Sequence, residues 1–205
     1  AIVIISLVFA ALLSLRFIQL DADPPIMLAQ YGQSALTDPY LYTWHARQAT
    51  LFPPDQQIEY ERFAPLKFTA VSAAARVVFA VAGVSRVTAN VASILLSLSG
   101  MLFWLLALRK FWSWGRVAIV GLLLLSNFIL ITYSRMPYLE NGLIFFFGLT
   151  SFVYARWGER TLGQILTGVA IAGAALCGKL FGVLLFVPVL ATQVYFLRPR
   201  SLRPI

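Results

Sequence analysis

The polar chemistry of this chain is concentrated in residues 35–52, with the sequence ALTDPYLYTWHARQATLF. This stretch contains Asp38, which precedes a proline, together with Arg47 and the only histidine of the chain, His45. A carboxylate placed here could accept a proton from an attacking hydroxyl or amine, and arginines could hold a leaving anion. We therefore interpret the stretch as the acidic side of an active site. The structural alternative is that Asp38 caps a helix.

Further charged residues outside this stretch could join it. Arg86 follows the polar segment, Arg135 and Glu140 belong to the sequence YSRMPYLEN, and Lys179 lies in CGKLFG between two apolar runs. Each has a simpler interpretation. Arg135 and Glu140 could form an exposed ion pair worth about 0–1 kcal/mol, and Lys179 could extend its ammonium group to a membrane interface. A lone histidine such as His45 is more often a local hydrogen-bond partner than a metal ligand.

The composition predicts an integral membrane protein. Hydrophobic residues make up 60% of the 205 positions and charged residues 12%, against about 45–50% and about 25% in soluble domains. A chain of this size cannot hide so much apolar surface from water. The net charge of +8 comes from basic residues that flank apolar runs, which is typical of membrane anchoring and excludes a nucleic-acid partner. Cys177 is the only cysteine, so the chain forms no internal disulfide or cysteine metal site.

The apolar runs predict the elements that position these residues. We expect transmembrane spans at residues 1–20, 87–108, 117–133, 141–155, 162–178 and 181–197. With a cytoplasmic N-terminus, the basic clusters near residues 109–116, 156–160 and 198–203 fall inside, as the positive-inside rule requires. Glycines in the fifth span predict close helix packing, namely Gly163, Gly168 and Gly173. Residues 66–84 would reverse this arrangement if they crossed, so we place them at the outer interface and leave open whether they cross.

The sequence thus predicts an all-α fold, a polytopic transmembrane helix bundle in which residues 1–205 form a single domain. Residues 21–86 form an outer loop with interfacial helices. Within that loop a helix should start at Thr37–Pro39 and end near Phe52, because two prolines follow. This topology places seven of the eight acidic residues on the outer side, together with the arginines of the loop and of the YSRMPYLEN turn. Acids and bases therefore converge on one surface.

Taken in order, several pieces of the chain resemble a known family. They are TDPYLYTWHARQATLF, FAVAGVSRVTAN, LALRKF, YSRMPYLENGLIFFF and LCGKLFGVLLF. In this order and spacing the sequence is similar to the N-terminal part of GT-C membrane glycosyltransferases that use polyprenyl-phosphate sugars, the protein O-mannosyltransferase and aminoarabinose-transferase group. We expect the chain to be the N-terminal part of a longer protein. The resemblance implies sugar transfer, with inversion, at the outer face of the plasma membrane.

The resemblance also implies roles for single residues. Asp38 takes the place of the catalytic base, and Glu140 matches an acid in the later turn. Family members carry a second acid beside the first, whereas this chain has Pro39 at that position. This difference argues against a pair of carboxylates bridged by a metal. Whether the enzyme needs a divalent metal stays open. The cations that match positions near the lipid phosphate or close the first loop are Arg86, Arg135 and Lys179, with His45 and Arg47 as further substrate-binding candidates.

Two other classes of function compete with an enzyme. A transporter or channel subunit would carry charges at mid-depth in its spans, where the chain offers Asn90, Asn127 and Gln164, none of them charged. A structural subunit of a membrane complex would need no convergent set of acids and bases. The sequence does not identify the sugar, the acceptor or the oligomeric state.

Overall fold

The computed structural model describes residues 2–22, 38–58, 61–178, 182, 184 and 187–189. Every regular element in these ranges is helical, which confirms the all-α class. The α-helices are α1 (Ile2–Ser14), α3 (Asp38–Leu41), α4 (Trp44–Leu51), α5 (Ala70–Ala82), α6 (Arg86–Leu108), α7 (Trp114–Ser126), α8 (Phe128–Ser134), α9 (Leu139–Trp157) and α10 (Thr161–Gly173). Short helical segments are η1 (Leu20–Ala22), η2 (Pro54–Gln56), η3 (Glu61–Phe68) and the π-helical η4 (Ala174–Gly178).

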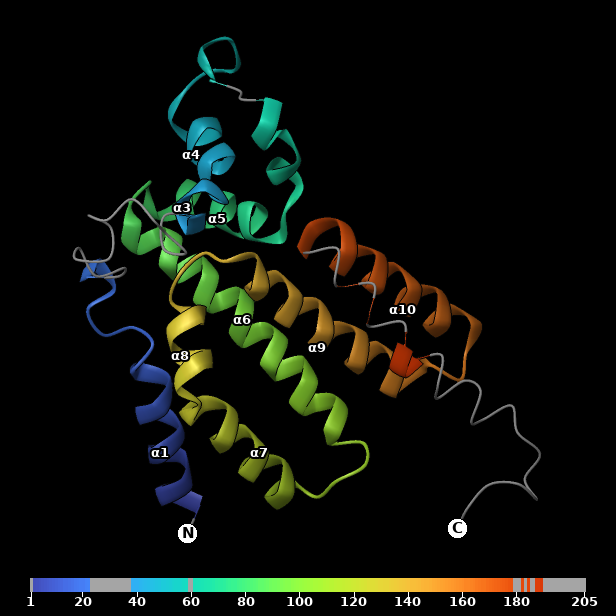
Figure 1. Ribbon diagram of the computed structural model, residues 1–205. Helices are drawn as coiled ribbons and strands as arrows, with labels where there is room; N and C mark the ends of the chain where they lie inside the picture. Colours follow the sequence, from blue (N-terminus) through green and yellow to red (C-terminus); the bar gives the residue numbers. More distant parts are fainter. Residues whose placement is uncertain are drawn as a thin grey trace.

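The long helices lie side by side, and the short ones gather at one end of them (Figure 1). Helices α6, α9 and α10 form one flank, while α1 and the pair α7–α8 form the other. Helices α3, α4 and α5 make a cap over the end where α1 finishes and α6 begins, which we call the cap end. A buried apolar cluster joins α4, α5 and α6 there, formed by Ala46, Ala75, Phe79, Ala89 and Ala92. This cluster fixes the cap on the bundle.

The turn between α5 and α6 is built from local signals in the sequence. Gly83 has a φ of +77°, a conformation that L-residues with a side chain rarely adopt, and it ends α5. Ser85 then accepts a hydrogen bond from the backbone N–H of Thr88 at 3.1 Å, while the Thr88 hydroxyl accepts one from the N–H of Ser85 at 2.9 Å. This reciprocal cap starts α6 and separates it from α5.

Helices α6 and α9 approach each other backbone to backbone. A Cβ atom added to Gly148 of α9 would collide with the backbone of Gly100 in α6, and one added to Gly100 would collide with the carbonyl of Ile144. Small residues allow this kind of contact between membrane helices. The glycines expected to pack behave differently from one another, because Gly173 lies against the Phe146 ring whereas Gly168 has open space around it.

The helices alternate in direction along the described part of the chain, as the predicted topology requires (Figure 1). The end of α1, the start of α6 and the α8–α9 turn all lie at the cap end. The α6–α7 and α9–α10 turns lie at the opposite end, and the basic residues in or beside them are Arg109, Lys110, Arg116, Arg156 and Arg160. These five cations therefore lie at the end of the bundle away from α3 and α4.

Two predicted spans differ in detail from the structure. Helix α1 ends at Ser14 rather than near Leu20, and residues 15–19 form turns. The span predicted at 117–133 is bent by 63° between α7 and α8. The bend occurs because the Asn127 side chain accepts a hydrogen bond from the N–H of Leu130 at 3.0 Å and so begins a new helix.

Helix lengths bear on which elements can cross a bilayer. Among the described residues one helix, α6, is long and apolar enough, and the pair α7–α8 would be a second if counted as one bent span. Helix α5 has 13 residues, which corresponds to about 20 Å of rise against a hydrocarbon thickness of about 30 Å. Helices α1, α7 and α10 also have 13 residues, so length does not distinguish α5 from them.

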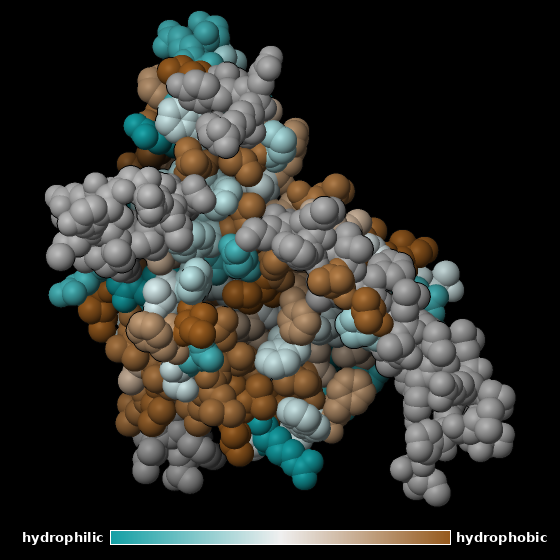
Figure 2. Space-filling model, viewed as in Figure 1, coloured by the Kyte–Doolittle hydropathy of each residue, from teal (hydrophilic) through white to brown (hydrophobic). Residues whose placement is uncertain are grey.

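Large apolar side chains point outward along the bundle. Examples are Leu95 and Leu102 on α6, Ile119 and Leu123 on α7, and Val169 on α10, all of them exposed. Figure 2 shows hydrophobic residues over much of the bundle and hydrophilic residues at the cap end. An apolar surface of this extent is typical of contact with lipid or with another protein.

The glycine crossing gives a test of the packing. We expect Gly148→Ala to lower the free energy of unfolding by about 1–3 kcal/mol, because the new methyl group must displace the Gly100 backbone. Gly168→Ala is the matched control, since it also lies inside a helix but has nothing within 4 Å of the added atom. Thermal unfolding of the purified protein in detergent would measure both. Equal melting temperatures for the two variants would contradict the close crossing.

Candidate functional site

A pocket of ≈ 510 Å³ lies at the cap end, between α3–α4 and the start of α6. We call it the cap pocket. Its lining includes Tyr40, Trp44, Arg47, Phe79, Ser85 and Arg86. Two of the predicted substrate-binding residues, Arg47 and Arg86, therefore share one cavity, although they are 39 positions apart in the sequence (86 − 47).

Each arginine of the cap pocket lies beside an aromatic ring. The Cζ atom of Arg47 is 6.0 Å from the centroid of the Trp44 ring, and that of Arg86 is 6.0 Å from the Tyr40 ring. No described carboxylate lines the pocket. The described part of the lining is therefore positively charged, which favours an anionic ligand, and its aromatic side chains offer apolar faces to the rest of that ligand.

Asp38 is placed near this pocket by the backbone. It is the first residue of α3, and Tyr40 and Leu41 of the same short helix line the cavity. The side chain of Asp38 lies outside the described atoms, so its catalytic role stays a prediction. The single helix expected from Thr37–Pro39 to Phe52 is divided into α3 and α4 by a turn at Tyr42–Thr43, and α4 ends at Leu51, before the two prolines.

Two further candidates lie outside the lining of the cap pocket, namely His45, predicted to bind substrate, and Glu140, predicted to be catalytic. His45 is buried on the side of α4 that also buries Ala46 and Gln48, and it is not among the residues that line the cap pocket. Glu140 lies in the first turn of α9, where a negative charge is stabilised by the helix dipole. Neither position tests the predicted role in substrate binding or catalysis.

Arg135 lies at the end of α8 and bonds to the chain that leaves α1. Its Nη1 donates to the carbonyl of Leu15 at 3.1 Å, and its Nη2 donates to the carbonyls of Ile18 at 2.5 Å and Gln19 at 3.3 Å. The chain that leaves α1 and the YSRMPYLEN turn are thus in direct contact. Lys179 lies outside the described residues.

Buried amides on α6 and α9 organise the cap end, and the sequence analysis did not assign them to the site. Asn90 is fully buried, donates to the carbonyl of Leu20 at 3.0 Å and accepts from the Tyr40 hydroxyl at 3.2 Å. Asn141 donates to the Ser93 hydroxyl at 2.6 Å and to carbonyls of the preceding turn. Polar residues inside long apolar helices are rarely placed there without a partner, and that signal could have found both.

Another arginine, Arg16, is buried at the break between α7 and α8. Arg16 is 0% exposed, and its guanidinium donates to the carbonyls of Leu12 at 3.3 Å, Leu125 at 3.1 Å and Leu124 at 3.5 Å. The last two carbonyls belong to the final turn of α7 and lose their helical partners because the helix bends. Arg16 therefore caps α7 with a positive charge, which also complements its dipole.

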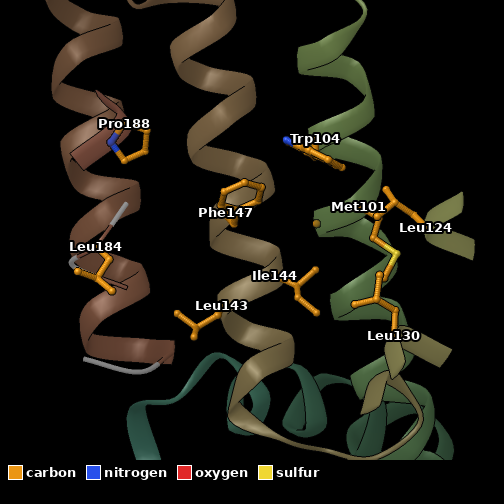
Figure 3. Close-up of a pocket in the computed structure, with 10 residues that line it drawn as sticks. Met101, Trp104, Leu124, Leu130, Leu143, Ile144, Phe147, Leu184 and Pro188 are labelled. Atoms are coloured by element: carbon orange, nitrogen blue, oxygen red, sulfur yellow. The ribbon is translucent and has the colours of Figure 1, made fainter. Parts of the chain in front are cut away.

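An apolar groove runs along α6 and α9 (Figure 3). Its cavity of ≈ 590 Å³ is lined by residues such as Met101 and Trp104 of α6 and Ile144 and Phe147 of α9. A smaller cavity of ≈ 300 Å³ shares Trp104 and Phe147 with it and continues toward the far end of α9. An elongated hydrocarbon fits such a lining, which contains almost no polar groups.

Metal ligands do not gather among the side chains that the structure describes. In that set no three histidine, cysteine, aspartate or glutamate residues form a group that could hold an ion. Asp23, Glu59 and the side chains of Asp38 and Glu61 lie outside it.

We compared the chain with known families, proteins and structures. No family model, curated protein or solved structure matches the chain.

The Asn90 hydrogen bonds can be tested by a double-mutant cycle. We expect Asn90→Ala to lower the free energy of unfolding by about 1–3 kcal/mol, because the buried Leu20 carbonyl loses its donor. Tyr40→Phe should cost about 0.5–1.5 kcal/mol in the parent and clearly less in the Asn90→Ala background, since both changes remove the same hydrogen bond. Thermal unfolding in detergent measures all four proteins. Additive effects of the two changes would refute the contact.

Proposed function

We propose that this chain is the membrane part of a glycosyltransferase that moves a sugar from a polyprenyl phosphate to an acceptor at the outer membrane face. The observation that carries the proposal is the cap pocket. Two arginines converge there with aromatic side chains, beside the helix that begins at Asp38. A sugar joined to a phosphate combines an anion with a ring that has apolar faces, and the pocket offers a partner for each part.

The proposed reaction is a single displacement with inversion. Asp38 accepts the proton of the acceptor hydroxyl or amine, and the freed electron pair forms a bond to the anomeric carbon of the sugar. The bond between that carbon and the phosphate oxygen breaks, and its electron pair leaves with the polyprenyl phosphate. Arg47 and Arg86 stabilise the charge that develops on the phosphate. Glu140 keeps the catalytic role, and His45 and Lys179 keep the substrate-binding roles, that the sequence analysis predicted for them.

The apolar groove supports a lipid-linked donor. Arg86 opens α6 in the cap pocket, and Gly100–Trp104 of the same helix line the groove. Gly100 lies 14 positions after Arg86 (100 − 86), which corresponds to about 20 Å along the helix. A polyprenyl phosphate carries its charge at one end of a long hydrocarbon chain, and α6 offers positive and apolar surfaces in that order.

A multi-pass arrangement in the membrane belongs to the same proposal. It is supported by the outward apolar side chains of α1, α6, α7 and α10 and by the cations at the end opposite the cap. With the N-terminus in the cytoplasm, the cap pocket faces outward. Helix α5 then lies at the outer interface, where its exposed Val77 and Val81 meet lipid and Arg76 reaches water.

A transporter is the second candidate, because one structural feature favours it. Broken helices in transporters expose carbonyls that coordinate cations, and the α7–α8 pair is broken at Asn127. Here, however, the carbonyls of Leu124 and Leu125 already accept hydrogen bonds from Arg16, which occupies the position that a transported cation would take. The enzyme is therefore the better supported function.

The role of Asp38 gives the first test of the enzyme. In the intact protein Asp38→Asn should reduce the turnover number for sugar transfer by about 10²–10⁴-fold, because the amide cannot accept the acceptor's proton. Asp55→Asn is the matched control, since Asp55 is an exposed acid of the same loop. Transfer of a radiolabelled sugar from polyprenyl phosphate in vesicles is the measurement. Parent-like transfer by Asp38→Asn would exclude the proposed base.

Substitution of Arg47 tests the proposed phosphate-binding site independently of the catalytic base. We expect Arg47→Ala to raise the KM for the donor by about tenfold or more, because a charge-assisted hydrogen bond contributes about 1.5–3 kcal/mol. Arg76→Ala should leave that KM unchanged, since Arg76 is exposed on α5 and does not line the cap pocket. Initial rates at varied donor concentration compare the two. An unchanged KM for Arg47→Ala would move the anion site elsewhere.

A further inference from the structure

The chain leaves α1 through residues 15–21, which we call the exit segment, and side chains from other helices hold its backbone. Arg135 donates to the carbonyls of Leu15, Ile18 and Gln19. The next two carbonyls are held from α6. Asn90 donates to Leu20 at 3.0 Å, and Arg86 donates to Asp21 at 3.4 Å. Five carbonyls in seven residues thus bond to side chains of α6 and α8.

The same two α6 residues also contact the other flank of the loop that follows. Asn90 accepts a hydrogen bond from the Tyr40 hydroxyl at 3.2 Å, and the Arg86 guanidinium lies 6.0 Å from the Tyr40 ring. Tyr40 is two positions after Asp38, in the same short helix. The exit segment and the helix that begins at Asp38 are therefore fixed on the first turns of α6, and Arg135 braces the exit segment from the other side.

The backbone conformation of Gln19 explains why the exit segment needs the hydrogen bonds from Arg135. Its φ is +50°, in the left-handed region that a residue with a side chain adopts only when its surroundings impose it. The carbonyls of Ile18 and Gln19 belong to the two peptide groups on either side of the Gln19 α-carbon, and both accept from Arg135 Nη2. The guanidinium therefore holds the strained residue from both sides.

We infer that Arg135 is a positioning residue rather than a ligand of the donor phosphate. It fixes the exit segment and, through Asn90 and Arg86, which contact both that segment and Tyr40, the helix that begins at Asp38. A guanidinium suits this task because its two terminal nitrogens donate to three carbonyls from one rigid plane, whereas the donors of a lysine ammonium all start from one nitrogen on a flexible stem. The inference rests on the proposed function only where it names Asp38 as the group that is positioned. The brace itself can be tested without any activity.

The structural test measures access to the exit segment. Leu20 is 6% exposed, so a cysteine introduced as Leu20→Cys, with Cys177→Ser, should react slowly with a membrane-impermeant maleimide. We expect Arg135→Ala and Arg135→Lys each to speed this labelling about tenfold or more, and the control Arg76→Ala to leave it unchanged. Adding Gln19→Gly to Arg135→Lys should restore much of the protection, because glycine adopts a positive φ without strain. Unchanged labelling in both Arg135 variants would overturn the inference.

The kinetic test separates positioning from phosphate binding. In the intact protein Arg135→Ala and Arg135→Lys should both lower kcat about tenfold or more and leave the donor KM within about threefold of the parent. A raised donor KM that Arg135→Lys largely restores would identify a phosphate ligand and overturn the inference. If Arg135→Ala does not fold, the labelling and kinetics of Arg135→Lys decide. If the parent transfers no sugar, the proposed function fails while the labelling still decides the role of Arg135.

Discussion

Backbone carbonyls that leave a helix in apolar surroundings must find hydrogen-bond donors, and much of this structure follows from that requirement. Helix α1 stops at Ser14 and α7 is broken at Asn127, so each leaves carbonyls without helical partners. An arginine meets the need in both places. Arg16, beside the end of α1, caps α7, while Arg135, at the end of α8, caps the chain that leaves α1. The α1 and α7–α8 elements therefore stabilise each other's ends.

The same requirement accounts for the buried amides of the cap end. The carbonyl of Met136 accepts from both Ser93, at 2.7 Å, and Asn141, at 2.8 Å, which ties the α8–α9 turn to α6. One turn earlier on α6, Asn90 ties the exit segment to Tyr40. Because a polar group buried without a partner costs about 1–3 kcal/mol, these contacts define one arrangement of the cap end instead of several.

Helix α6 connects this polar frame to the apolar part of the molecule. Its first turns carry Arg86 and Asn90, while its middle carries Gly100, at the crossing with α9, and Met101 and Trp104, in the groove. The close crossing at Gly100 keeps α9 near enough for one wall of the groove to come from each helix. A charged pocket and a hydrocarbon-sized groove are thus held at a fixed spacing by a single rigid element, an arrangement suited to an amphiphilic ligand.

The sequence by itself determined the helical class and the order of the helices. Hydropathy and the Pro53–Pro54 stop are local properties, and they placed most helices to within a few residues. Arg47 and Arg86 were assigned to one site, and they line one pocket.

Only the tertiary structure decided the contacts between distant positions. Arg16 bonds to Leu125, 109 positions away, and Arg135 bonds to Leu15, 120 positions away. These contacts depend on where α7 bends and where α1 ends, because only there do backbone carbonyls lack a helical partner. No local sequence pattern identifies which arginine will donate a hydrogen bond to them.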